Sequence, residues 1–196
     1  MNLKSLFLVG CTLLFSQLIG SQTKNEKEER IELNTFPEKA IKVLETLPED
    51  CKRLRFYKET DGSKQSFEAK FKYKKQRYSI EFNSSGTIED IEVSLKPKDI
   101  ENAVASEIRA YFKTTYKRSK LIKIQKQYVF NPVLNPIDFL RDVLAKRSRM
   151  DINYEIIAEV KSDSKRNIRE FTFDNNGGFL NYKIIHPGSY EHALYY

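Results

Sequence analysis

The sequence predicts an α+β fold made of two copies of one unit, in which one helix precedes a four-stranded antiparallel sheet. Residues 82–93 align without a gap on residues 173–184, and phenylalanine, glycine and apolar residues recur at the same offsets. Gly86 and Gly177 supply the positive φ that a short turn between two strands needs. Because one copy alone would leave its sheet face poorly buried, we expect the two copies to share one core.

The strands are predicted from an alternation of apolar and polar residues with a period of two. Residues 67–73 place apolar side chains on one face and Glu or Lys on the other, and residues 152–160 also carry an apolar face. Such alternation is typical of an antiparallel sheet with one face in water. Residues 53–59 and 121–129 supply the strand that follows the helix in each copy.

The helices are predicted from apolar side chains at helical spacing. Pro37 suits a first helical position and Pro48 ends the helix of the first copy, while the second helix covers residues 98–115. The second copy also has an insertion, residues 131–149, in which a short amphipathic helix ends in a basic cluster. That helix either caps an open end of the core, which we favour, or serves a function of its own.

The chain is therefore expected to contain a signal peptide, a linker, two repeats and a tail. The expected boundaries are 1–21 for the signal peptide, 22–33 for a charged linker, 34–96 for the first repeat, 97–187 for the second repeat with its insertion at 131–149, and 188–196 for the tail.

The first residues have the three parts of a secretory signal. One positive charge, Lys4, precedes an apolar run over residues 6–15, and small and polar residues follow at 20–22. A membrane-spanning helix needs about 20 apolar residues, so we expect no transmembrane segment and cleavage near residues 20–22. The sequence before Cys11 also resembles a bacterial lipobox. A lipoprotein anchored through Cys11 is thus the alternative to a periplasmic or secreted protein.

The composition is basic, with 34 Lys and Arg residues, 27 Asp and Glu residues and a formal net charge of +7. Such a surplus draws a protein toward anionic surfaces, which leaves peripheral association with a membrane open. Basic and acidic residues are interleaved along most of the chain, however, and that pattern is typical of a solvated surface. Export argues against nucleic acid as a partner.

No catalytic motif stands out. The chain lacks a nucleophile elbow, a phosphate-binding glycine loop and a zincin motif. Cys51 would be the only cysteine left after cleavage, and both histidines lie far from it in the sequence, so we expect it to be structural. His186 and His192 lack companion ligands at the spacing of a metal site. We therefore expect neither an enzyme nor a metal or cofactor.

A binding function needs only a surface, and the polar face of the predicted sheets offers one. An aromatic side chain among long polar ones suits the recognition of a protein or peptide. The alternative is a solvated face stabilised by cross-strand charge pairs, each worth roughly 0.2–1 kcal/mol. The candidate partner-binding residues on this face are Arg55, Tyr57, Lys70, Lys72, Gln125 and Lys183.

Residues 54–62, 67–71 and 78–82, with Gly86 at the turn, resemble the bacterial PepSY-like domains, also described as β-lactamase-inhibitor-like. The resemblance covers residues 34–187, although the insertion departs from the more compact family pattern. Family members are typically exported, contain two α-plus-β units and have no established enzymatic activity. The resemblance implies a periplasmic binding or inhibitor-like module that recognises a protein or peptide with the open face of its sheet. The alternative is a structural or stress-related envelope protein that associates with anionic surfaces without a specific ligand.

Overall fold

The computed structural model describes residues 22–24, 26–147, 150–162 and 165–186, most of which belong to one sheet of ten strands. Neighbouring strands follow the order β1-β10-β9-β8-β7-β6-β5-β4-β3-β2, and every pair is antiparallel except β1 with β10. The strands are β1 (Gln22–Lys24), β2 (Glu26–Ile31), β3 (Lys52–Asp61), β4 (Lys64–Tyr73), β5 (Gln76–Asn83), β6 (Ile88–Ser94), β7 (Arg118–Val129), β8 (Ile152–Ser162), β9 (Lys165–Phe173) and β10 (Phe179–Ile185).

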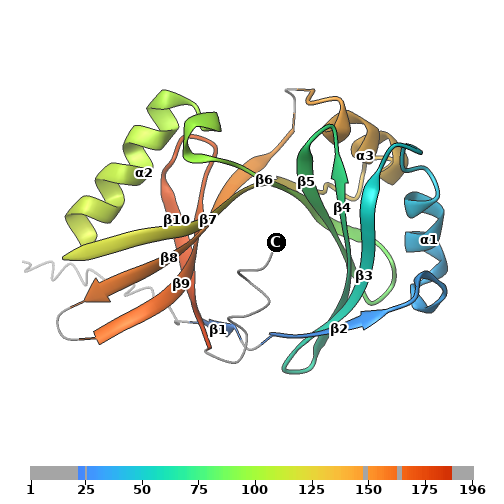
Figure 1. The fold of residues 1–196 in the computed structure, drawn as a ribbon, viewed down its shortest axis with the longest axis horizontal. Helices are drawn as coiled ribbons and strands as arrows, with labels where there is room; N and C mark the ends of the chain where they lie inside the picture. Colours follow the sequence, from blue (N-terminus) through green and yellow to red (C-terminus); the bar gives the residue numbers. More distant parts are fainter. Residues whose placement is uncertain (1–21, 25, 148–149, 163–164, 187–196) are drawn as a thin grey trace, which may run out of the picture.

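Three α-helices cover the outer, convex side of the curved sheet (Figure 1). They are α1 (Glu38–Leu44), α2 (Asn102–Thr115) and α3 (Pro136–Leu144), and short 3-10 turns at Leu33–Thr35 and Pro97–Asp99 precede the first two. Within the described ranges, no helix combines the length and the apolar character that crossing a membrane requires.

The sheet curves until its two ends meet. β1 and β2 occupy opposite ends of the strand order, yet only one residue separates them in the sequence. The Lys24 ammonium of β1 lies 3.1 Å from a Glu26 carboxylate oxygen of β2, so the two ends are in contact (Figure 1, bottom). We call β1 and β2 together the closing segment. Residues 22–33 were predicted to be a charged linker; the structure forms the closing segment there instead.

The apolar side chains form two clusters beneath the helices. Alternation along the strands directs Ile80, Ile91, Ile156 and Phe171 toward the helices, and each is 0% exposed. The first cluster packs α1 and α3 against β4, β5 and β6, and the second packs α2 against β7, β8 and β9. The helix of the insertion belongs to the first cluster, where the Phe139 ring lies 5.1 Å from that of Phe130.

The predicted fold class, a tandem repeat of one helix plus a four-stranded sheet with one shared core, is wrong. Asp90–Ser94 of β6 pair with Gln125–Val129 of β7, and this pairing joins all the strands into one sheet. The closing segment then adds a strand at each end. Since the helices cover different parts of a single sheet, the apolar residues form two clusters, and α3 of the predicted second repeat packs in the first of them.

The two hairpin turns have the predicted backbone geometry. Gly86 has a φ of 81° and Gly177 a φ of 86°, which confirms the positive φ expected of both. In each turn one side-chain oxygen accepts hydrogen bonds from two backbone N–H groups. Asn83 Oδ1 accepts them from Ser85 and Thr87, and Asp174 Oδ1 accepts them from Asn176 and Gly178.

Candidate functional site

The inner, concave face of the sheet is charged, which follows from the same alternation that builds the core. Glu81, Glu92, Glu155 and Glu170 each adjoin one of the apolar residues that face the helices, so their side chains point to the opposite face. Because the sheet closes on itself, side chains from strands distant in the order converge inside it. The Lys24 ammonium of β1, for example, lies 3.1 Å from a Glu26 carboxylate oxygen of β2, at the other end of the strand order, as well as 2.9 Å from a Glu170 carboxylate oxygen of β9.

An acidic cavity of about 520 Å³ occupies part of this interior. Among the described residues that line it, carboxylates outnumber the lysines by nine to three. The carboxylates belong to Glu26, Glu59, Asp61, Glu81, Glu89, Asp90, Glu92, Glu155 and Glu170, and the lysines are Lys24, Lys64 and Lys183. The cavity is thus strongly acidic in a chain whose net charge is positive.

Lys24 neutralises one part of the cavity. Its ammonium group contacts both Glu26 and Glu170, and its side chain is only 18% exposed. Burial alone would lower the pKa of Lys24, but the charge of Glu170, followed by that of Glu26, raises it well above its usual value. Burial likewise would raise the pKa of Glu170, but Lys24 and then Lys183 hold it below the usual range. Lys24 and Glu170 are therefore both charged at neutral pH.

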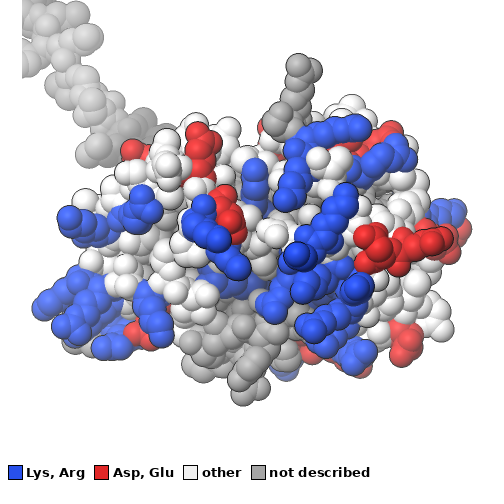
Figure 2. Space-filling model, turned by 45° about the horizontal axis from the view of Figure 1, so that its top comes forward, with Lys and Arg blue, Asp and Glu red and all other residues white. Residues whose placement is uncertain are grey.

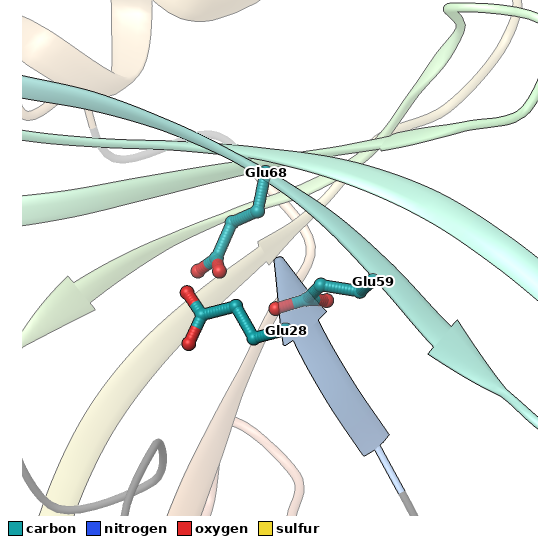
Figure 3. A group of neighbouring side chains, drawn as sticks. All are labelled: Glu28, Glu59 and Glu68. Carbon is teal, nitrogen blue, oxygen red and sulfur yellow. The ribbon is translucent and has the colours of Figure 1, made fainter. Parts of the chain in front are cut away.

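Lys70 neutralises two members of a second acidic group, Glu28 and Glu68. Together with Glu59, their side chains point toward one another from β2, β4 and β3 (Figure 3). The Lys70 ammonium group lies 2.7 Å from Glu28 and 2.8 Å from Glu68, and 4.8 Å from the centre of the Tyr57 ring. Burial, and then the charge of Glu68, raises the pKa of Glu59 far above its usual value. Burial would also raise the pKa of Glu68, but Lys70 holds it low. Glu59 is therefore protonated beside a charged Glu68.

A third group of three carboxylates lies on β5 and β6. One oxygen atom from each of Glu81, Asp90 and Glu92 lies within 4.8 Å of the others. Burial raises the pKa of Glu81 and of Asp90, and the negative charge of neighbouring carboxylates raises both further.

A basic groove of about 160 Å³ runs along the same face beside the acidic cavity. Two of the sheet's irregularities border it: the register shifts between Lys52 and Arg55 in β3 and between Leu121 and Lys123 in β7. Arg53 in the first of these has a φ of 59°, a conformation that non-glycine residues adopt at a cost. The basic residues that line the groove are Arg53, Arg55, Lys70, Lys72, Arg77 and Lys123, against the acidic Glu68 and Glu92.

The candidate residues from the sequence all lie on the concave face, but they differ in accessibility. Lys70, Tyr57 and Gln125 are largely buried, and Gln125 donates a hydrogen bond to Glu92. Lys183 lines the acidic cavity, 3.7 Å from Glu170. Only Arg55, which is exposed, and Lys72, which is half-buried, offer the basic groove an accessible charge.

Sequence reasoning missed the acidic cavity and the groove residues Arg77 and Lys123. Some of the acidic residues could have been found, because alternation with buried apolar residues places Glu81, Asp90, Glu92, Glu155 and Glu170 on the polar face of the sheet. The sequence does not show that the sheet curves until its two ends meet, which brings the strands together around one interior.

The residues considered for chemistry do not meet. Cys51 is half-buried, and burial, followed by the charge of Asp50, raises the pKa of its thiol, so the structure does not activate it as a nucleophile. His186 is exposed and donates its backbone N–H to the Lys24 carbonyl. His192, Cys11, the predicted signal peptide and the predicted tail at 188–196 lie outside the described residues.

No protein-family model and no curated protein matches the chain. Solved structures do resemble it. A DUF2874 family protein from Bacteroides ovatus is 9% identical with a TM-score of 0.50, and the match covers 76% of this chain and 88% of that one. A BLIP-like protein from Bacteroides fragilis is 15% identical with a TM-score of 0.46, over 76% and 86% of the two chains. A candidate calcium-regulated periplasmic protein from Bacteroides thetaiotaomicron is 19% identical with a TM-score of 0.30, over 80% and 96%. At these identities the first structure shows a similar fold, and the other two add no argument about function.

Proposed function

We propose that the protein is an exported, non-enzymatic binding module of the PepSY-like, β-lactamase-inhibitor-like type, which holds an acidic segment of an envelope protein in the basic groove. The observation that carries the proposal is the convergence of six basic side chains from β3, β4, β5 and β7 on that groove, of which Lys70 already pairs with Glu28 and Glu68. Arginine guanidinium groups present forked donors that match carboxylates, and such charge-assisted hydrogen bonds are about twice as strong as neutral ones.

The groove is built at a cost to the fold, which supports a role in binding. Lys72 lies directly opposite Arg77 in the β4–β5 ladder, and Lys52 lies opposite Lys72 in the β3–β4 ladder. Like charges in opposed positions destabilise a sheet. Together with the positive φ of Arg53, these pairs concentrate strain and repulsion where an anionic ligand would relieve them.

The surface charge favours one other candidate, attraction to anionic surfaces without a specific ligand. Figure 2 shows Lys and Arg side chains on both halves of the face that it draws, interspersed with fewer acidic ones. A dispersed distribution of this kind would produce weak attraction that salt screens. Binding in the basic groove instead requires particular residues. Variants that change the net charge equally, inside and outside the groove, therefore distinguish the two candidate functions.

We predict that the double variant Arg53→Glu/Arg77→Glu weakens the binding of a fluorescent oligoglutamate peptide at least about tenfold, since each charge-assisted contact contributes about 1.5–3 kcal/mol. Fluorescence anisotropy measures the affinity. The matched control is Lys96→Glu/Lys98→Glu, which changes the net charge equally at two exposed positions outside the groove. Because Arg77→Glu turns a repulsive pair with Lys72 into an attractive one, the groove variant should remain folded.

Equal weakening by both double variants, together with binding that does not saturate, would replace the groove model with the anionic-surface model. Affinity capture of the mature protein from an envelope extract, with the groove variant as the negative control, then identifies the natural partner. A partner retained equally by the wild-type protein and the groove variant would place recognition elsewhere.

A further inference from the structure

Glu81, Asp90 and Glu92 meet because of strand register. Glu81 of β5 lies directly opposite Asp90 of β6, and Glu92 follows two positions along the same strand. The residue between them, Ile91, is fully buried against the helices, so Asp90 and Glu92 both point inward. Three carboxylates therefore line one wall of the acidic cavity.

Within the described residues, this group differs from the acidic groups around Lys24 and Lys70 because no lysine or arginine forms an ion pair with it. Lys24 pairs with Glu26 and Glu170, Lys70 pairs with Glu28 and Glu68, and Lys64 lies 3.0 Å from Glu89. Among the described residues, no ion pair reaches Glu81, Asp90 or Glu92.

Asp90 supplies the second observation. The residue is only 9% exposed, and its Oδ1 atom is buried with no hydrogen-bond partner within the described part of the chain. A buried carboxylate oxygen without a partner is costly to the fold. Oxygen atoms of this kind, from three neighbouring carboxylates, are the donors that hard cations prefer.

The remaining oxygen of Asp90 is held in place. Gln127 Nε2 donates a hydrogen bond of 3.0 Å to Asp90 Oδ2 and a second one, also of 3.0 Å, to Glu155 Oε1. Asn153 in turn donates to the Gln127 carbonyl oxygen at 3.1 Å. The Gln127 side-chain amide, held by hydrogen bonds on two sides, therefore fixes the orientation of the Asp90 carboxylate. Hydrogen-bond partners orient the ligands of metal sites in the same way.

We propose that Glu81, Asp90 and Glu92 bind a hard divalent cation, with Ca²⁺ as the first choice. Carboxylate and water oxygens suit Ca²⁺, Mg²⁺ and Mn²⁺, whereas zinc sites recruit nitrogen and sulfur. Ca–O bonds of about 2.3–2.6 Å allow one ion to bridge oxygens that lie within 4.8 Å of one another. The cavity of about 520 Å³ leaves room for the waters that complete six to eight ligands. Glu92 also lines the basic groove, whereas Glu81 and Asp90 line the acidic cavity and not the groove.

Calorimetric titration of the mature protein with CaCl₂, MgCl₂ and MnCl₂ tests the site. We expect saturable Ca²⁺ binding, and at about 1 mM CaCl₂ a rise in Tm of roughly 2–4 °C over the same protein in EDTA. Asp90→Asn, which keeps the acceptor for Gln127, should weaken Ca²⁺ binding at least about tenfold, because affinity follows the charge of the ligands. In EDTA this variant should be at least as stable as the wild type, so its loss of binding is not a loss of folding.

The matched control is Glu59→Gln, which alters a buried carboxyl on the same face, in the group that contains the Lys70 partners Glu28 and Glu68. Ca²⁺ binding by this variant within about twofold of the wild type supports the proposed ligands. The proposal is overturned if none of the three ions binds the wild type, if Asp90→Asn binds Ca²⁺ as well as the wild type does, or if Glu59→Gln loses as much binding as Asp90→Asn. A preference for Mg²⁺ or Mn²⁺ over Ca²⁺ would support the site and change only its favoured ion. None of these measurements involves the acidic peptide.

Discussion

Gly86 and Gly177 occupy equivalent hairpin turns, each tucked under the first turn of a helix. A Cβ atom on Gly86 would lie 2.8 Å from Pro37 Cβ and 3.0 Å from the Ala40 nitrogen. One on Gly177 would lie 2.8 Å from the Val104 carbonyl oxygen. These glycines therefore set how closely α1 and α2 approach the sheet, in addition to allowing the turns.

We predict that Gly86→Ala lowers the free energy of unfolding by about 2–4 kcal/mol, because the methyl group meets the start of α1 and the backbone keeps its positive φ. Gly62→Ala is the control: its φ is also positive, at 60°, but no atom lies within 4 Å of the added Cβ. Gly62→Ala should lower the free energy of unfolding by about 1 kcal/mol, which is the cost of the backbone strain alone. Urea denaturation measures both, and equal losses would show that the contact with the helix contributes nothing.

For individual residues, the sequence predicts the features that depend on local backbone geometry and misses those that depend on partners far away in the chain. The turn glycines were predictable because a short hairpin requires positive φ wherever it occurs. Lys70 was named as a candidate partner-binding residue, and the sequence does not show that Glu28 pairs with it from a segment expected to be a linker. No local pattern shows that a residue 42 positions away is its partner.

The closing segment joins the two ends of the sheet largely through one side chain. Lys24 of β1 forms ion pairs to β2 and to β9, while β1 itself contributes only three residues of parallel pairing to β10. Removing one member of a buried ion pair leaves the other charge uncompensated, which destabilises a fold more strongly than the pair stabilises it.

We predict that Lys24→Met lowers the free energy of unfolding by about 2–4 kcal/mol and increases hydrogen exchange in β10. Lys27→Met, an exposed position on the same segment, should change stability by less than about 0.5 kcal/mol. If the two variants are equally stable at neutral pH, the closure does not depend on Lys24.

The effect of Lys24→Met should depend on pH. Lys24 and Lys183 hold the pKa of Glu170 below its usual range despite burial, so the ion pair stabilises the fold fully above the unfolded pKa of about 4.3. That stabilisation is lost as the pH falls through the lowered pKa of the folded state. The difference between wild type and variant should therefore shrink between about pH 6 and about pH 3, and a constant difference would contradict it.

Among the elements, the helices and the strands of the two hairpins were predictable from periodicity, whereas the closing segment was not. Glu26 and Glu28 face the interior, but they are as polar as the outward-facing Lys27 and Glu29. A strand with charges on both faces has no alternation to detect, and its pairing depends on partners elsewhere. For the same reason the sequence could not show that β6 pairs with β7 and joins all the strands into one sheet.

The whole molecule combines one sheet with two apolar clusters, and its halves are linked by the pairing of β6 with β7 and by the packing of α3 in the first cluster. The ladder between β6 and β7 is short and pairs five residues of each strand, from Asp90–Val129 to Ser94–Gln125. Sub-global opening of one half should then be possible while the other stays folded.

We predict that Phe82→Ala, in the first cluster, lowers hydrogen-exchange protection in β3, β4 and β5 more than in β8 and β9, and that Phe171→Ala, in the second cluster, does the reverse. Both side chains are fully buried, so each truncation should cost about 3–5 kcal/mol. Uniform loss of protection across all ten strands in both variants would show that the molecule opens as a single unit.

The meeting of the two ends of the sheet also determines the order in which the strands can pair during folding. The first described strand, β1, has its sheet partner in the last, β10, about 160 residues later in the chain. A polypeptide that emerges with its N-terminus first must therefore leave β1 unpaired until nearly all of the chain has followed. During that interval the sheet has open edges, which are sites of aggregation. If the protein is exported as proposed, the acidic interior is enclosed only after translocation, so it would take up its cation from the envelope and not from the cytoplasm.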